Sequence, residues 1–188
     1  MWNLIHSRAR RFRKNEDGAT AIEFAILSVP FLALLFSIIE LALVFFLSST
    51  LTHAMNEAAR DVRTGEFQAT CGGAPEFKQS VCSHMGSLGN CNKLRIDVVT
   101  SPSGQFQPNM LPPTPTTEDP ANPGQPQVQP DQYVNSVARD VVVVRAQYYH
   151  QLAFPGQWTR LSNQPGNNRV LTSSTAFRNE PFPGGGCV

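Results

Sequence analysis

Apolar residues are concentrated in one continuous stretch near the N-terminus of the chain. The segment Phe24–Leu51 spans 28 residues and holds one ionisable side chain, Glu40. As a helix rising ~1.5 Å per residue it measures ~42 Å, enough to cross a hydrocarbon core of ~30 Å with some tilt. The apolar core of a cleaved signal peptide is only ~7–15 residues long. The pattern therefore predicts a transmembrane helix that is retained.

Helical periodicity continues beyond the apolar stretch. Apolar side chains recur at steps of three and four residues, as on one face of a helix, at Leu47, Leu51, Met55, Ala58 and Val62. Gly65 then supplies a residue suited to a helix C-terminus. We predict one helix over Ala19–Thr64, ~69 Å long, with its first half in lipid and its second half an amphipathic stalk. Pro30 predicts a kink, because proline removes a backbone donor.

Strand patterns follow in the second half of the chain. Lys93–Thr100 alternates apolar and polar residues and predicts a half-buried strand, whereas the valine-rich Arg139–Gln151 predicts a central one. A third strand is expected in Asn168–Phe182. The segment 101–130 contains nine prolines and predicts an extended loop, either a spacer or hairpin tip or a docking site. Strands without helical crossovers favour an antiparallel sheet. The expected fold class is α+β, with the stalk covering the sheet.

Charge and apolar content divide the chain into three expected regions. These are a basic leader over 1–18, a transmembrane helix and stalk over 19–65, and an extracytoplasmic α+β domain over 66–188. The leader holds Arg8, Arg10, Arg11, Arg13 and Lys14. Positive charge directly before an apolar helix favours a cytoplasmic N-terminus. A patch for nucleic acid or lipid headgroups is the alternative, but a nucleic-acid footprint should also recur on the folded domain, so we expect no nucleic-acid partner.

The cysteines all follow the apolar helix, at Cys71, Cys82, Cys91 and Cys187. In an oxidising compartment an even number of cysteines indicates disulfides, and four allow three pairings. The alternative is a metal site formed by Cys71, Cys82, His84 and Cys91. Those spacings lack the short C-x2-C unit of most zinc sites. We expect disulfides and no metal.

Catalytic motifs are not found in the sequence. It lacks the G-x-S-x-G, H-E-x-x-H and G-x-x-x-x-G-K patterns. No carboxylate or serine is placed by sequence to orient any of the four histidines, His6, His53, His84 and His150. We therefore expect neither an enzyme nor a cofactor, and no small-molecule substrate.

One carboxylate lies within the apolar segment and another directly precedes it, and each costs at least ~2.5 kcal/mol at bilayer depth. Glu23 and Glu40 are 17 residues apart and fall on different helix sides, so they do not form a paired proton relay. Glu23 is near the helix N-terminus, where unsatisfied N–H groups favour an acid. Glu40 needs a polar partner on a neighbouring helix, unless it is protonated or snorkels. Ser37, one turn earlier, is a local candidate.

The N-terminal third resembles a known family. In "RFRKNEDGATAIEF" a basic leader precedes Gly18, with Glu23 at the fifth position after it and Phe24 at the sixth. This resembles the processing site of type IV prepilins, especially the type IVb subgroup. The order of "DGATAIEFAI", proline, "IIE" and "NEAARDVRTGE" is similar to the TadE-like (TadE/TadG) pilus assembly proteins. "FRNEPF", Phe177–Phe182, also looks like these proteins, with less specificity.

The resemblance implies a minor pilin or pseudopilin of a Tad (Flp-type) pilus in a bacterial inner membrane. A prepilin peptidase would cut between Gly18 and Ala19, and Glu23 would pair with the new amine of a neighbouring subunit. Phe24 and Glu40 would join the helix assembly. The implied partners are the membrane, other pilins or pseudopilins and assembly-platform proteins, with the C-terminal domain periplasmic and incorporation in a surface pilus open. The alternative is a periplasmic binding or adhesion module with an uncleaved anchor.

Overall fold

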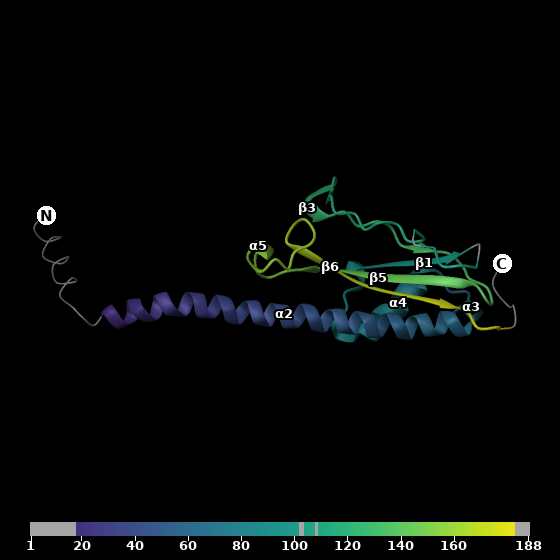
Figure 1. Cartoon of the computed structure of the whole chain (residues 1–188), viewed down its shortest axis with the longest axis horizontal. Helices are drawn as coiled ribbons and strands as arrows, with labels where there is room; N and C mark the ends of the chain where they lie inside the picture. The colour runs from purple at the N-terminus through teal and green to yellow at the C-terminus, as the bar shows by residue number, and fades with distance from the viewer. Residues whose placement is uncertain (1–17, 102–103, 108, 183–188) are drawn as a thin grey trace, which may run out of the picture. The chain divides into compact units, whose positions relative to one another are not determined.

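The computed structural model describes residues 18–101, 104–107 and 109–182 (Figure 1). These residues form one long helix, a four-stranded sheet, a two-stranded hairpin and several short helices. The chain divides into two compact units, and the boundary falls inside the long helix, between Ile39 and Glu40.

The long helix α2 spans Ala19–Thr64, which confirms the predicted helix bounds. It continues through Pro30, and the kink expected there stays a prediction. Gly65 follows with φ +85°, a left-handed conformation that glycine adopts without steric cost and that ends the helix. By length and composition, α2 is the one helix in the described residues that could cross a membrane.

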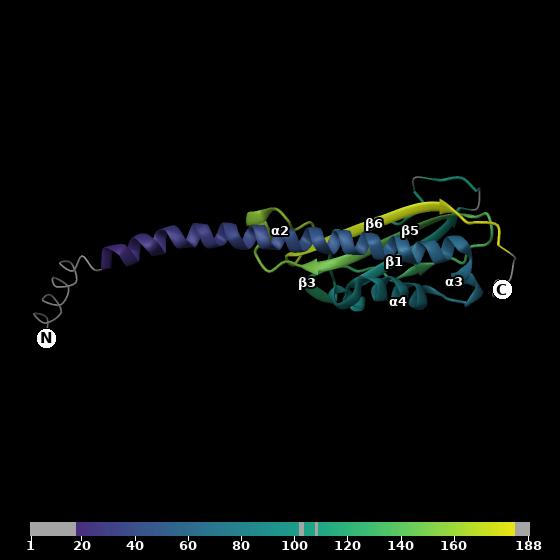
Figure 2. The ribbon, with the colours of Figure 1, turned by 90° about the horizontal axis from the view of Figure 1, so that it is seen from below.

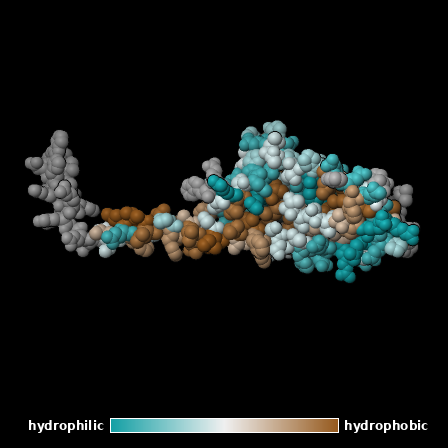
Figure 3. Space-filling view, viewed as in Figure 1, coloured by the Kyte–Doolittle hydropathy of each residue, from teal (hydrophilic) through white to brown (hydrophobic). Residues whose placement is uncertain are grey.

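In the first unit the described residues, 18–39, expose side chains around the whole helix. Only Ser28 and Ser37 are partly covered, and each hydroxyl donates to a carbonyl in the preceding turn. Apart from Thr20 and Glu23 the exposed side chains are apolar, and they include Ile22, Phe24, Ile26, Leu27, Val29, Phe31, Leu34 and Ile38 (Figure 3). The helical residues 19–39 rise ~31 Å, close to the thickness of a hydrocarbon core.

The second unit is built on a sheet with the strand order β4-β1-β5-β6. Its strands are β1 (Leu94–Ser101), β4 (Gln132–Tyr133), β5 (Val141–Gln151) and β6 (Asn168–Arg178). The pairs β1–β5 and β5–β6 are antiparallel, as expected, but β4 runs parallel to β1. The sheet is therefore mixed, and the expectation of a purely antiparallel sheet was wrong because two-residue β4 carries no alternating pattern. The α+β fold class is confirmed.

One face of this sheet is covered by helices. The part of α2 from Glu40 onward and α4 (Ala74–Met85) lie on this face, with α4 beside β1 (Figures 1 and 2). Their apolar side chains form one core with the sheet, which includes Val44, Leu51, Met55, Val62, Phe77, Val81, Ile96, Val98, Val144 and Tyr148. The amphipathic stripe predicted on the stalk is the stripe that packs here.

The opposite face of the sheet is covered by the connection between β1 and β5. This connection includes β4 and a hairpin of β2 (Glu118–Asp119) and β3 (Asn122–Pro126). Thr114 and Pro130 accept hydrogen bonds from Gln147 and Arg95 of the sheet. β1 is consequently buried on both faces rather than half-buried. The proline-rich segment was predicted to be a loop without a core of its own, and the structure uses part of it as a cover.

Two short α-helices and two 3-10 turns are the remaining elements of the described chain. α3 (Glu66–Ala69) follows the turn at Gly65, and α5 (Gly156–Thr159) lies in the connection from β5 to β6. Single 3-10 turns occupy Gly86–Leu88 and Cys91–Lys93. α4 places a short helix between Cys71 and Cys91. It starts at a capping arrangement in which the Glu76 carboxylate accepts from the Gly73 N–H at 2.8 Å.

Candidate functional site

The expected processing site lies at the start of α2. Gly18 is exposed and directly precedes Ala19, the first residue of α2. Glu23 and Phe24 follow one turn later, both exposed, and Phe24 is 74% accessible. Glu23 has no ion pair or hydrogen bond within the part of the chain that is described. An acid without a partner in its own chain is free to meet one in another subunit.

The basic residues of the leader, Arg8, Arg10, Arg11, Arg13 and Lys14, lie outside the described residues. Their role in topology, and cleavage at Gly18, therefore stay predictions.

Glu40 lies in an entirely different environment. It is 4% accessible and is the first residue of the α2 face that packs on the domain. Its Oε1 accepts hydrogen bonds from the backbone N–H groups of Ala153 at 2.5 Å and Phe154 at 3.2 Å. Its Oε2 is buried and has no hydrogen-bond partner in the described chain. The partner of Glu40 is thus the β5–β6 connection, 113 residues further along the chain.

Ser37, the local candidate for a partner of Glu40, does not bond to this carboxylate in the described structure. Its hydroxyl donates to the carbonyl oxygen of Ala33 at 2.7 Å. Inside an apolar helix, a serine hydroxyl commonly donates a hydrogen bond to a carbonyl oxygen in the preceding turn. Backbone groups of a distant loop satisfy Glu40 instead.

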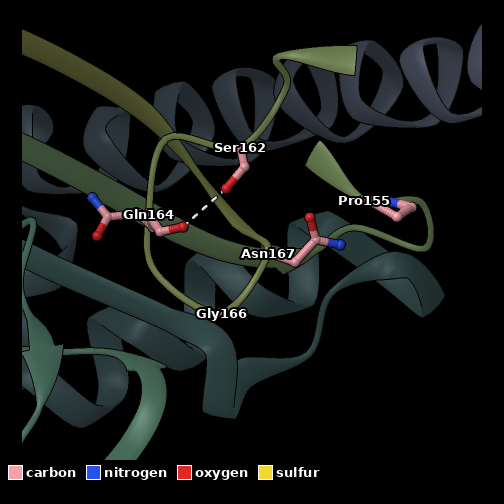
Figure 4. A pocket seen from close by; sticks show the side chains of 5 residues that line it. All are labelled: Pro155, Ser162, Gln164, Gly166 and Asn167. Carbon is pink, nitrogen blue, oxygen red and sulfur yellow. Dashed lines mark hydrogen bonds between the residues drawn. The ribbon is translucent and has the colours of Figure 1, made fainter. Parts of the chain in front are cut away.

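Asn167 holds the same loop from its other side. Its Nδ2 donates to the carbonyl oxygens of Leu152 and Phe154, and its Oδ1 accepts from the N–H of Gly156. The residue has φ +60°, which asparagine tolerates better than most side chains. Figure 4 shows the surrounding pocket, with Ser162 donating to the carbonyl oxygen of Gln164. Glu40 and Asn167 together fix the backbone at Leu152–Gly156.

His150 lies at the end of β5, close to this site. Burial is the main cause that lowers the pKa of His150 below 6.5, and the charge of Lys93 lowers it further. The carboxylate of Glu40 acts in the opposite direction and raises the pKa. The pKa of His150 therefore depends on the charge of the Glu40 carboxylate.

A second cluster fixes the C-terminal end of α2. The N–H of Glu180 donates to the carbonyl oxygen of Arg63 at 3.0 Å, and their side chains form an exposed ion pair at 3.4 Å. A Cβ at Gly65 would lie 2.5 Å from the ring of Phe182. The segments "NEAARDVRTGE" and "FRNEPF", far apart in the sequence, thus meet at this helix end.

A buried ionic network lies on the loop-covered face of the sheet. Asp97 is fully buried and accepts from Arg95 at 2.7 Å and from Arg145 at 2.6 Å. Arg95 also donates to the Gln147 side chain at 2.9 Å. The alternation in β1 gave no sign of this network, because charged residues on alternate positions ordinarily indicate a solvent-facing side. With two guanidinium groups around one carboxylate, the network carries net positive charge.

The cysteines in the described residues are all oxidised. Cys82 is bonded to Cys91, across the turn that follows α4, and Cys71 is also in a disulfide. Cys187 lies outside the described residues. The alternative metal site at Cys71, Cys82, His84 and Cys91 was wrong, because sulfur atoms in disulfides offer no thiolate to a metal.

These features define a class of protein, an α+β domain built onto the C-terminal half of a long apolar helix. Residues 18–60 match the family model described as TadE-like protein. The match confirms the TadE-like resemblance over these residues and supports an association with Tad pili. No curated protein and no solved structure matches the chain significantly.

Proposed function

We propose that the protein is a minor pilin or pseudopilin of a Tad (Flp-type) pilus that helps to initiate or assemble the pilus by lateral packing of α2. The observation that carries the proposal is the division of α2 at Glu40. Before that residue, apolar side chains are exposed on all sides of the helix, whereas after it one face belongs to the domain. An exposed apolar helix of this length can cross the lipid bilayer and can then pack against the helices of neighbouring subunits during assembly.

In this proposal the leader is cytoplasmic and the domain is periplasmic. The basic residues before the helix and the oxidised cysteines after it both support that orientation. A prepilin peptidase cuts after Gly18 at the inner-membrane surface, and Ala19 becomes the N-terminus. Glu23 then pairs with the amine of an adjacent subunit, an ion pair that strengthens as water is excluded.

The packing surface extends beyond the segment that crosses the membrane. Leu41, Leu43, Phe45 and Phe46 follow Glu40 and remain exposed, each by more than half. They lie away from the buried stripe of Glu40, Val44 and Leu47. A neighbouring helix can therefore contact α2 for nearly two turns past Glu40.

Intact mass of the membrane-extracted protein tests the processing step. Co-expression with an active prepilin peptidase should yield a chain that begins at Ala19, and an inactive peptidase should yield one that begins at Met1. A chain that begins at Met1 under both conditions would favour the alternative, a periplasmic binding or adhesion module on a plain anchor.

Glu23→Gln separates processing from assembly. We expect normal cleavage but strongly reduced piliation, because the amide no longer supplies the negative charge for a neighbour's amine. Glu66→Gln, which changes an exposed acid just outside α2, is the matched control and should form normal pili. Unchanged piliation in Glu23→Gln would contradict the proposed role of Glu23.

A further inference from the structure

The two edge strands of the four-stranded sheet differ in how readily a further strand could pair with them. One edge is β4, which has only two residues and follows Pro130 and Asp131. The other is β6, which has 11 residues, and no strand pairs with its outer side in the described part of the chain. Proteins usually blunt exposed edges with proline, charge or bulges, because unpaired backbone groups attract further strands. From Val170 to Phe177, β6 has none of these.

The hydrogen bonds of β6 identify the backbone groups that point outward. The N–H and carbonyl of Val170 both bond to the side chain of Asn163, which occupies the place of a neighbouring strand. Backbone direction alternates along a strand, so the residues that share the outward direction of Val170 are Thr172, Ser174 and Ala176. They are exposed, and their outward groups have no partner in the described chain. Asn163 caps only the first part of this edge.

A basic groove runs beside the free part of the edge. It is lined by Arg60 and Arg63 of α2 and by Thr175, Ala176 and Phe177 of β6. Arg63 already pairs with Glu180, whereas Arg60 is exposed and has no ion pair in the described residues. A strand added to β6 would direct alternate side chains toward this groove. Acidic side chains at those positions would complement Arg60.

We propose that the free edge of β6 binds an extended, acidic segment of a partner protein by strand addition. The backbone of Thr172, Ser174 and Ala176 supplies the hydrogen bonds, and Arg60 selects for negative charge. A second copy of this chain fits less well, because antiparallel pairing of two β6 edges would bring both Arg60 side chains to one seam. This interface lies in the α+β domain and is separate from the helix packing proposed above.

The test uses the full chain in detergent micelles and two synthetic peptides, TEVETEV and TKVKTKV. Hydrogen–deuterium exchange of the segment Asn168–Arg178 is measured by mass spectrometry. We expect the glutamate peptide to slow exchange there, and the lysine peptide to need at least about tenfold higher concentration for equal protection. Equal protection by both peptides, or none by either, would overturn the proposal.

Three variants locate the site. Ser174→Pro removes an N–H that points away from β5, so it should abolish protection while leaving the sheet paired. Arg60→Glu leaves the edge intact and should weaken the glutamate peptide selectively. Lys93→Glu, an exposed control two strands away and at the opposite end of the sheet from Thr175–Phe177, should not. Protection that survives both Ser174→Pro and Arg60→Glu would refute the site. Concentration-dependent protection without peptide would identify a second copy as the occupant instead.

Discussion

The two halves of the continuous helix α2 lie in opposite environments. Residues 19–39 expose their side chains on every side, whereas from Glu40 onward one stripe is buried against the sheet and α4. Each half carries one acid in an apolar setting, and the acids follow the same division. Glu23 is exposed and lacks a partner in the described chain, whereas Glu40 is buried and bonds to a loop of its own domain.

The difference teaches that a costly acid in an apolar helix can serve either within the subunit or between subunits. Glu40 marks the residue at which α2 begins to pack against the domain. The 21 helical residues before it match the thickness of a hydrocarbon core without any contribution from residues beyond it. Glu23 is left for contacts that arise only on assembly.

The largest effect on this contrast is expected from Glu40→Leu. The change leaves the N–H groups of Ala153 and Phe154 without an acceptor, and should reduce the free energy of unfolding by about 2–4 kcal/mol. Urea denaturation of the full chain in micelles, followed by near-ultraviolet circular dichroism, measures it. Glu40→Gln retains an acceptor and should lose roughly half as much.

Glu23→Leu is the matched change in the first half and should leave the domain's stability unaltered. Equal losses from the two leucine variants would remove the distinction between the two acids.

The next largest loss of stability is expected at the C-terminal end of α2, where Gly65 follows Thr64. Gly65→Ala places a Cβ against the ring of Phe182 and forces φ +85° on a residue that disfavours it. We expect a loss of about 1–3 kcal/mol, measured by the same denaturation. Gly124→Ala is a useful control, because Gly124 has a similar φ (+81°) but open space where its Cβ would be. A Gly65→Ala loss no larger than that of Gly124→Ala would show that Phe182 does not restrain the helix end.

The features that could be predicted from the sequence are those with a local pattern. Three- and four-residue spacing determined the helix to Thr64, and valine-rich or alternating runs determined the positions of β1, β5 and β6. The parallel strand β4 could not be found, because two residues have no measurable period. The sequence also located both acids, since charges stand out in an apolar run.

The partners of these groups could not be predicted. Glu40 bonds to backbone N–H groups at Ala153 and Phe154, and any residue other than proline offers the same donor. The burial of Arg95 and Asp97 depends on a loop that returns over the sheet, which their own strand pattern does not encode. The one local hint near Glu40 was Asn167, an asparagine directly after glycine, which is a common turn signal.

The smallest predicted effect concerns pH and extends the contrast to His150. Because burial lowers its pKa in the folded chain, the unfolded chain binds the proton more readily near pH 6. Stability should therefore be full above the unfolded pKa of 6.5 and should decline as the pH falls below it, and His150→Gln should flatten this part of the profile.

Glu40 opposes the lowering, so Glu40→Gln should lower the pKa of His150 further, whereas Glu23→Gln should not change it. Nuclear magnetic resonance titration of the imidazole measures both variants. An unchanged pKa in Glu40→Gln would mean that its carboxylate exerts no field on the β5 end, and would leave the two acids distinguished by their hydrogen bonds alone.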